Sequence, residues 1–365
     1  MKLNDVTILE RWYPSNFEKK LKGRRIVFEQ IEPLINKLPS KFRKEIVGHS
    51  ENNIPIYKIS IGTGKTKILA WSQMHGNEST GTKALFDLFK FLSSPIPELK
   101  AISDKILLNC TLEFIVLLNP DGAIKFTREN ANNIDLNRDA VDKKAIESKL
   151  LRRVLDEFKP KFCFNLHDQR TIFNISKTNN PATLSFLAPS EDVERTLTRG
   201  RKETMSVIVE MNKLLQQIIP NQIGRYTDEF YPTATGDNFQ KLGYNTILIE
   251  AGHYKNDYER EITRKFNFYA LLKGVYFIAT GSHFNNYKPY FEIPNNDTKF
   301  LDIIYKNAKT VKNNSTTIED IGIQYIFKVE NDRLIMYKHI EKRGDLSDFY
   351  TYDLKNAENL DINDL

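Results

Sequence analysis

The spacing of apolar and polar positions changes repeatedly along the chain and predicts alternating strands and helices up to about residue 280. Apolar or alternating runs predict strands at 44–47, 54–61, 67–71, 107–118, 162–166, 183–187 and 246–250. Apolar residues at helical spacing predict helices at 16–38, 79–92, 141–158, 193–219 and 258–280. The first of these helices is expected to be broken at Pro33 and to end at Pro39. This alternation favours an α/β fold with a mixed central sheet between helical layers.

The pattern changes after the last predicted helix. Residues 285–296 contain two prolines and four asparagines, a composition typical of a linker. Short apolar alternations at 321–329 and 333–339 predict strands of a small β-rich unit. A chain of 365 residues is long enough for one large and one small domain. We therefore expect a large domain over 1–282 and a β-rich C-terminal domain over 283–365, whose role the sequence does not assign.

Composition places the chain among soluble globular proteins, with 40% hydrophobic and 27% charged residues. The first thirty residues carry charges throughout, and no apolar run is long enough to cross a bilayer. The sequence therefore predicts a cytoplasmic protein without a membrane partner. Cys110 and Cys163 lie in apolar runs, where buried free thiols are expected, although a disulfide between them stays open.

The formal net charge of +6 raises the question of nucleic acid binding. Basic residues gather at 19–25 and at 195–202, but acidic residues flank both clusters. Neither cluster has the interleaved aromatic side chains on which single-stranded bases stack. We interpret both clusters as solvated helix faces and expect no nucleic acid partner.

Chemically reactive side chains follow three of the predicted strands. His75 and Glu78 come after the strand at 67–71, and His167 ends the strand at 162–166. Glu250 closes the strand at 246–250. Because α/β sheets place ligands at strand ends, these side chains are expected to converge. Two imidazoles and one carboxylate leave a fourth position open on zinc, as a catalytic site requires.

The order of these motifs resembles that of the zinc carboxypeptidases, the metallocarboxypeptidase family. That family has a His-x-x-Glu pair, an arginine, an Asn-Arg pair after an aspartate, a distant histidine and a late glutamate. The corresponding residues here are His75, Glu78, Arg128, Asp135, Asn137, Arg138, His167 and Glu250. The run Asn119-Pro120-Asp121-Gly122 strengthens the resemblance, which covers about residues 40–280. The ligand set is the one known from carboxypeptidase A.

The resemblance implies that His75, Glu78 and His167 hold one Zn²⁺ ion per chain. Asp135 would then orient His75 by accepting its other ring proton. Glu250 would be the general base, taking a proton from a zinc-activated water and passing it to the leaving amine. The alternative for Asp135 is a capping or turn residue, and the alternative for Glu250 is one half of a buried salt bridge.

The resemblance also implies an anion-binding set. Arg128 would stabilise the developing oxyanion. Asn137 and Arg138 would bind the C-terminal carboxylate of the substrate, because a guanidinium fork matches a carboxylate with two parallel hydrogen bonds. The alternative for Asn137 and Arg138 is a polar turn before a helix.

Two further substrate-binding roles are implied less directly. The family has a mobile tyrosine before the catalytic glutamate, and Tyr231 is the first candidate, with Tyr226 as the second. Asp237 and Asn238 fall near the specificity pocket of the family. If they line it, the preferred substrate has a basic, polar or amino-bearing terminal residue.

Three hypotheses about function follow. The first is a metallocarboxypeptidase, a zinc-dependent hydrolase and protease that cleaves the C-terminal bond of a peptide. The second is an N-acyl amino acid amidohydrolase, an aspartoacylase-like deacylase on the same scaffold, which the β-rich C-terminal unit keeps open. The Asn119-Pro120-Asp121-Gly122 run and the long loop at 226–239 favour the peptidase over this deacylase. Both would act on a substrate with a free carboxylate. The third is a non-catalytic peptide-binding module, and the presence of Glu250 argues against it because binding needs no base.

Overall fold

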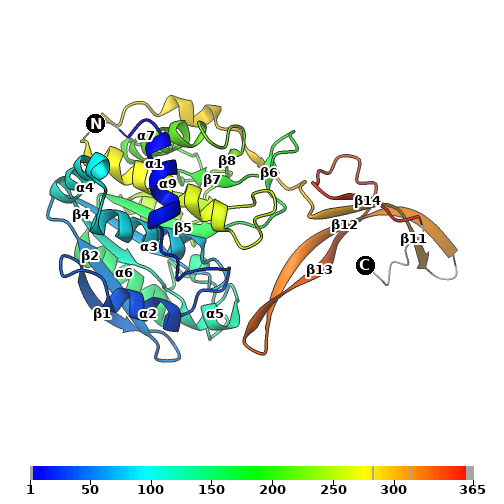
Figure 1. Cartoon of the computed structure of the whole chain (residues 1–365), viewed down its shortest axis with the longest axis horizontal. Helices are drawn as coiled ribbons and strands as arrows, with labels where there is room; N and C mark the ends of the chain where they lie inside the picture. The colour runs from blue at the N-terminus through cyan, green and yellow to red at the C-terminus, as the bar shows by residue number, and fades with distance from the viewer. Residues whose placement is uncertain (1–2, 282, 313–314, 359–365) are drawn as a thin grey trace.

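The computed structural model describes residues 3–281, 283–312 and 315–358, and it has a large α/β part and a separate C-terminal sheet (Figure 1). The strands of the large sheet, in spatial order, are β1 (Arg43–His49), β2 (Pro55–Ile61), β4 (Cys110–Ile115), β3 (Thr66–Ser72), β5 (Phe162–Asp168), β9 (Asn245–Ala251), β7 (Leu184–Leu187) and β8 (Ile223–Arg225). The pairs β4–β3, β3–β5, β5–β9 and β7–β8 are parallel, and the pairs β1–β2, β2–β4 and β7–β9 are antiparallel. The predicted mixed sheet is confirmed.

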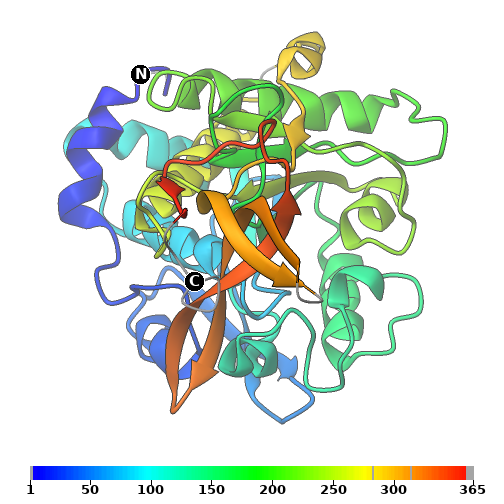
Figure 2. The ribbon, with the colours of Figure 1, turned by 90° about the vertical axis from the view of Figure 1, so that its right-hand side faces the viewer.

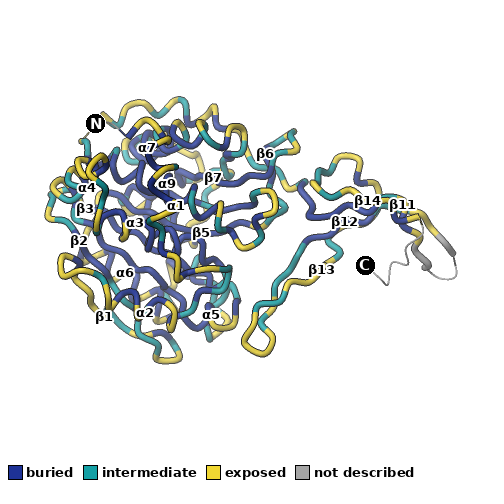
Figure 3. Tube along the Cα trace, viewed as in Figure 1, coloured by how far each residue is buried: buried dark blue, intermediate teal, exposed yellow. Residues whose placement is uncertain are grey.

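Helices cover both faces of this sheet. They are α1 (Thr7–Asn16), α2 (Phe28–Asn36), α3 (Thr80–Ser93), α4 (Pro97–Asn109), α5 (Pro120–Lys125), α6 (Ile146–Phe158), α7 (Arg199–Leu215), α8 (Thr235–Lys241) and α9 (Glu261–Ala279). Alternate residues of β3 belong to different cores: Ile68 packs with the apolar faces of α3, α7 and α9, whereas Leu69 packs with α6. Figure 3 shows the resulting buried interior in dark blue. Burial on both faces explains why the central strands are continuously apolar.

The elements predicted up to residue 280 correspond to observed ones, with two main differences. The prediction of one helix over 16–38 is wrong, because the chain forms α1 and α2 with an irregular segment between them. Gly23 in that segment has a φ of +80°, which a helix cannot contain. The apolar run 107–118 was expected to be strand throughout, but its first residues end α4 and the strand β4 starts only at Cys110.

Both cysteines are buried free thiols, as expected, and they do not form the disulfide that the sequence leaves open. Cys110 begins β4 and Cys163 lies in β5. Among the described residues, no helix is both long and apolar enough to span a membrane.

The C-terminal sheet contains four strands in the order β13-β12-β11-β14. Their bounds are β11 (Ile303–Lys312), β12 (Ser315–Glu330), β13 (Arg333–Gly344) and β14 (Leu354–Asn356). The strands β12 and β13 form a long antiparallel hairpin, and both residues of its turn, Asn331 and Asp332, have positive φ. Asn and Asp tolerate this conformation, which the twist of a tight hairpin requires. The strands predicted at 321–329 and 333–339 are therefore present and longer than expected.

The segment before this sheet is more ordered than a simple linker. It contains η2 (Lys288–Glu292) and the short strand β10 (Asn296–Asp297), which pairs with β6 (Asn174–Ile175) of the large part. The predicted domain boundary falls at residue 282, which lies outside the described residues. The division into two domains remains a prediction. In Figure 2, the C-terminal strands cross in front of the large part.

Candidate active site

The loop between β3 and α3 carries two of the predicted metal ligands, His75 and Glu78. Its path depends on Gly76, because a Cβ atom there would lie 2.0 Å from the carbonyl carbon of Gly122. This close approach of two backbones requires glycine. The loop therefore reaches its position only by packing directly on the segment that follows β4.

The run Asn119-Pro120-Asp121-Gly122 supports this loop. Asn119 donates from its side-chain amide to the carbonyl oxygen of Met74 at 3.1 Å, directly before His75. Its side-chain oxygen accepts from the backbone N–H of Gly122 at 2.8 Å and so caps α5. Asn119 thus connects the cap of one helix to the loop that holds the ligands.

The other two reactive side chains lie on neighbouring strands. His167 of β5 and Glu250 of β9 are partners in the parallel register of the two strands. The guanidinium of Arg260 donates to the backbone oxygens of Ala251 and Gln169, just beyond these residues. This buried arginine ties the two strand ends together. Nothing in the sequence indicates this role of Arg260, because the residue follows a loop and belongs to none of the recognised motifs.

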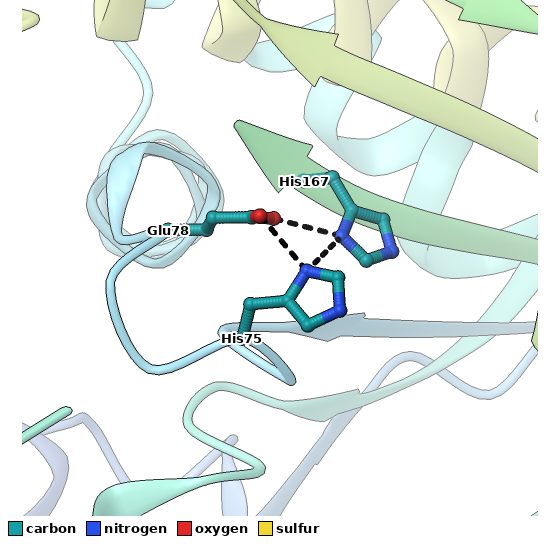
Figure 4. Close-up of side chains that lie close together, drawn as sticks. All are labelled: His75, Glu78 and His167. Carbon is teal, nitrogen blue, oxygen red and sulfur yellow. Dashed lines mark hydrogen bonds and ion pairs between the residues drawn. The ribbon is translucent and has the colours of Figure 1, made fainter. Parts of the chain in front are cut away.

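His75, Glu78 and His167 form one buried cluster (Figure 4). One oxygen of Glu78 lies 2.8 Å from Nδ1 of His75, and the other lies 2.8 Å from Nδ1 of His167. The two Nδ1 atoms are 3.2 Å apart. One donor atom from each residue fits within 4.8 Å, so a single ion can be held by all three. The sequence prediction that these three residues converge agrees with this geometry.

The hydrogen bonds of His75 define which nitrogen can bind a metal. Nε2 of His75 lies 3.1 Å from a carboxylate oxygen of Asp135 and therefore carries the ring proton. Nδ1 then keeps its lone pair and points at Glu78 and His167. An oxygen of Glu78 also accepts from the backbone N–H of Asp168 at 3.1 Å, which fixes that carboxylate. Electron-rich atoms from three residues thus meet at one point, and a cation is the partner that satisfies them. Imidazole and carboxylate together suit zinc.

Charges within the cluster shift the ionisation of its members. Burial would raise the pKa of Glu78, but the two adjacent imidazoles hold that pKa well below its usual range. Burial would lower the pKa of His75, but Glu78 and Asp135 outweigh it and raise that pKa. For His167 burial prevails and lowers the pKa. Glu78 is therefore a carboxylate and His167 a neutral imidazole, the forms in which they bind metals.

Glu250 has the opposite character to Glu78. Burial, together with the nearby carboxylates of Glu78 and Asp168, raises the pKa of Glu250 well above its usual range. A carboxyl group in this environment takes up a proton readily, as a general base must. The structure places it beside His167, facing the same pocket as the cluster.

Arg128 lies over the cluster. Its Nε donates to Asp135 at 2.9 Å, and its Nη1 lies 3.2 Å from Nδ1 of His75 and 3.6 Å from Glu78. Asp135 therefore holds both His75 and Arg128, and these two partners lower its pKa despite partial burial. The side chain of Arg128 is 40% exposed, so its guanidinium remains available at the pocket surface.

Asn137 and Arg138 line the same pocket, a cavity of about 350 Å³ that also contains His75, Glu78 and Glu250. They form η1 (Leu136–Arg138), which Asp135 caps by accepting from the N–H of Asn137 at 2.8 Å. Asp135 is thus both a capping residue and the partner of His75. The sequence offers these two roles as alternatives, and the structure combines them. The side chain of Arg138 is exposed to the pocket.

Both candidate tyrosines line the pocket, in different environments. Tyr231 is 48% exposed, and its hydroxyl donates to Glu229 at 3.1 Å. Tyr226 packs on Phe173, and burial followed by the charge of Glu250 raises its pKa well above the usual range. Tyr226 is therefore the one near the candidate base, while Tyr231 lies at the rim.

Asp237 lines the pocket next to apolar side chains, including Leu248 and Leu187. It accepts from the backbone N–H of Tyr231 at 3.1 Å. Burial raises the pKa of Asp237 to about 6. Asn238 is not among the pocket residues, and its amide donates to the carbonyl oxygen of Pro232 at 3.4 Å.

Comparison with known proteins agrees with this geometry. A family model described as zinc carboxypeptidase matches residues 29–213, more than half of the chain. The chain belongs to the zinc carboxypeptidase family. The matched segment contains all three candidate ligands, and the chain continues beyond it through Glu250 to the C-terminal sheet.

Individual members of the family are distant in sequence from this chain. The carboxypeptidase SOL1 of Arabidopsis thaliana is 32% identical over 102 residues, which cover 26% of this chain and 21% of that protein. The chain therefore matches about a fifth of the length of that relative.

Solved structures show the same fold. A metallo-carboxypeptidase from Burkholderia cenocepacia superposes with a TM-score of 0.55 at 15% identity, covering 68% of this chain and 67% of the other. Carboxypeptidase A from Helicoverpa armigera gives a TM-score of 0.54 at 14% identity, covering 75% and 80%. At such low identity these likenesses establish the fold alone.

Proposed function

We propose that the protein is a zinc-dependent metallocarboxypeptidase that hydrolyses the C-terminal bond of a peptide. The observation that carries the proposal is the single pocket that contains His75, Glu78, Arg138 and Glu250, with His167 beside the last of these. A metal-ligand cluster, a base and a carboxylate-binding arginine are the parts that exopeptidase chemistry needs. Family membership supports the same activity.

The ligands His75, Glu78 and His167 are proposed to hold one zinc ion, with Asp135 fixing the ring of His75. When bound there, zinc supplies a Lewis acid that polarises a carbonyl group and acidifies a water molecule. Glu250 accepts the proton of the attacking water and returns it to the leaving amine. Burial and the nearby carboxylates of Glu78 and Asp168 raise the pKa of Glu250, which favours uptake of this proton.

Arg128 is proposed to stabilise negative charge that develops on the scissile carbonyl oxygen. Because Asp135 holds its Nε, Nη1 of Arg128 already lies beside His75 and Glu78, where the scissile carbonyl is expected. Arg138 and Asn137 are proposed to bind the terminal carboxylate of the substrate, since both line the pocket that also contains His75, Glu78 and Glu250. Binding that carboxylate sets the cleavage position at one residue from the end.

The side chain of the terminal residue is proposed to enter the part of the pocket lined by Asp237. A basic or amino-bearing side chain would favour the ionised form of Asp237 and pair with it. The protonated form of Asp237 would instead hydrogen-bond to an uncharged polar side chain. We therefore propose a preference for C-terminal lysine or a similar residue over phenylalanine. A clear preference for phenylalanine would contradict this part of the proposal.

An aspartoacylase-like deacylase that acts on N-acyl amino acids is the second candidate. The observation that favours it is the β-rich C-terminal sheet, which contacts the large part of the chain beside the site. Both candidates use the same ligands, base and carboxylate clamp, so they differ only in what lies on the other side of the scissile amide.

A substrate panel tests the proposal. The zinc-loaded wild type and Glu250→Gln are incubated with ordinary peptides, muropeptide fragments and N-acyl amino acids, and released amino acids are quantified. We expect the wild type to release terminal amino acids from peptides and Glu250→Gln to be slower by at least a hundredfold. Preferential cleavage of N-acyl amino acids would favour the deacylase. Stoichiometric zinc without any cleavage would favour a binding module.

A further inference from the structure

The β12–β13 hairpin contacts the large part of the chain close to the candidate site. The ring of Phe327 lies 4.6 Å from the guanidinium of Arg24 and 6.3 Å from the ring of Phe126. Phe126 precedes the candidate oxyanion residue Arg128 by two positions. The backbone oxygen of Arg24 accepts from the hydroxyl of Ser79, which follows the ligand Glu78.

A second contact lies on the β5 side of the site. Glu341 of β13 pairs with Arg170 at 2.6 Å, and Arg170 lines the pocket three positions after His167. At the tip of the hairpin, Asp332 pairs with Arg25 at 2.9 Å. Of the residues that the hairpin contacts, Arg170 lines the pocket, and Arg24 is hydrogen-bonded to Ser79 beside Glu78. These contacts hold the hairpin against the large part at residues near the site, and Figure 2 shows the strands of the hairpin in front of the large part.

The register of the hairpin determines which side chains face the large part. Phe327 is paired with Met336, and Val329 is paired with Leu334. Paired residues of an antiparallel ladder point to the same face, and so do residues two apart on one strand. Because Phe327 touches Arg24 and Phe126, the side chains of Val329, Leu334 and Met336 also face the large part.

This inward face is apolar and incompletely covered. Met336 is 44% exposed, and Val329 and Leu334 are partly exposed. Figure 3 shows the hairpin in teal and yellow, in contrast to the buried base of the same sheet. Neighbouring apolar side chains that stay exposed on one face are typical of a binding surface. Because Glu341 of the same strand pairs with the pocket residue Arg170, a ligand that extends from the pocket can contact these apolar side chains.

We propose that the inward face of the β12–β13 hairpin, made by Phe327, Val329, Leu334 and Met336, binds the substrate residues that precede the scissile bond. This inference rests on the proposed peptidase function and adds a substrate class to it: extended peptides with apolar residues upstream of the cleaved bond. The occupant is the substrate itself, because the strand that carries Met336 also reaches the pocket, where its Glu341 pairs with the pocket residue Arg170. Met336 is a specificity-determining residue, and Glu341 positions Arg170.

Two neighbouring residues of β13 allow a matched test. Met336 faces the large part, and Tyr337, which is 36% exposed, points to the opposite face because strand side chains alternate. The variants Met336→Asp and Tyr337→Asp therefore add the same charge to the same exposed strand on opposite sides. The substrates are a blocked dipeptide and a hexapeptide with the same two terminal residues and four apolar residues before them.

We expect Met336→Asp to lower kcat/KM for the hexapeptide at least fivefold, through KM, and to leave the blocked dipeptide within twofold of wild type. Tyr337→Asp should change neither substrate by more than twofold. An equal loss on both substrates, or no loss on the hexapeptide, would overturn the proposal. If the wild type cleaves neither substrate, the proposed peptidase function is rejected, and the hairpin proposal is judged separately. Binding of the fluorescently labelled hexapeptide then decides: equal affinity for wild type and Met336→Asp overturns the proposal, and fivefold weaker binding by Met336→Asp alone supports it.

Discussion

Asp135 accepts from Nε2 of His75 at 3.1 Å and thereby leaves Nδ1 of that imidazole facing Glu78 and His167. One carboxylate outside the cluster thus sets the tautomer of a residue inside it. The same carboxylate holds Arg128 at 2.9 Å. The orientation of a ligand and that of the candidate oxyanion residue therefore depend on one side chain.

The first prediction concerns this dependence. Asp135→Ala removes the acceptor for Nε2 of His75, so the ring loses its preferred tautomer and orientation. Loss of such a partner typically lowers metal affinity about 10- to 100-fold. Zinc affinity measured by competition with a chromophoric chelator at pH 7 should show this loss. Asp142→Ala, at an exposed position, is the control and should bind zinc as wild type does. Unchanged affinity in Asp135→Ala would remove the assigned role.

The second prediction concerns the close backbone contact under the ligand loop. In Gly76→Ala the new Cβ would meet the backbone of Gly122, so the loop carrying His75 and Glu78 has to move. We expect zinc affinity to fall at least tenfold. Gly281→Ala serves as a control because a Cβ there meets open space, although its positive φ makes a small loss of stability expected. Wild-type zinc affinity in Gly76→Ala would show that the loop tolerates displacement.

The third prediction is a pH-dependent substrate preference. Because the pKa of Asp237 is raised to about 6, this carboxyl group is mostly protonated at pH 5 and mostly ionised at pH 7. The ratio of kcat/KM for C-terminal lysine over phenylalanine peptides should therefore rise about tenfold or more between these pH values. In Asp237→Asn the ratio should be low and flat. A wild-type ratio that does not change with pH would contradict the placement of Asp237 in the specificity pocket.

The fourth prediction concerns stability and a buried ion pair between α3 and α9. Both side chains of the Asp87–Arg264 pair are fully buried, and Arg264 reaches both carboxylate oxygens, at 2.6 and 2.7 Å. Arg264 also donates to the backbone oxygens of Leu21 and Glu18, which anchors the irregular segment between α1 and α2. Asp87→Ala leaves the buried Arg264 with only the partly exposed Glu261, at 3.2 Å, as a carboxylate partner, and should cost about 3–5 kcal/mol in the free energy of unfolding.

Denaturant unfolding followed by circular dichroism measures this cost. The control is Asp104→Ala, which removes an exposed pair with Lys100 and should cost less than about 1 kcal/mol. If both variants unfold at the same denaturant concentration, the buried pair is not the anchor of the N-terminal segment.

Much of the fold could be predicted from the sequence because its signals are local. Strands of the central sheet are continuous apolar runs, and the helix α3 has its apolar residues at helical spacing. The error over residues 16–38 has a non-local cause. The segment between α1 and α2 is held by Arg264, more than 240 positions away, and no local pattern reveals that contact.

The candidate site was predictable for a different reason. His75, Glu78 and His167 are recognisable by their order and residue type, since zinc accepts few side chains and the fold brings strand ends together. The environment of the tyrosines was not predictable, because the positions of Tyr226 and Tyr231 depend on the path of a loop. The same holds for the hairpin: Arg170 and Glu341 are 171 positions apart and meet only through the packing of two sheets.

The most direct test of the account is the release of the terminal amino acid from a blocked C-terminal lysine dipeptide, followed for the zinc-loaded wild type and for Glu250→Gln with equal zinc content. The account predicts release by the wild type and a rate at least a hundredfold lower for Glu250→Gln, because the ligands stay in place while the base is lost. Equal rates for the two proteins, or no release by a wild type that holds one zinc ion per chain, would contradict it.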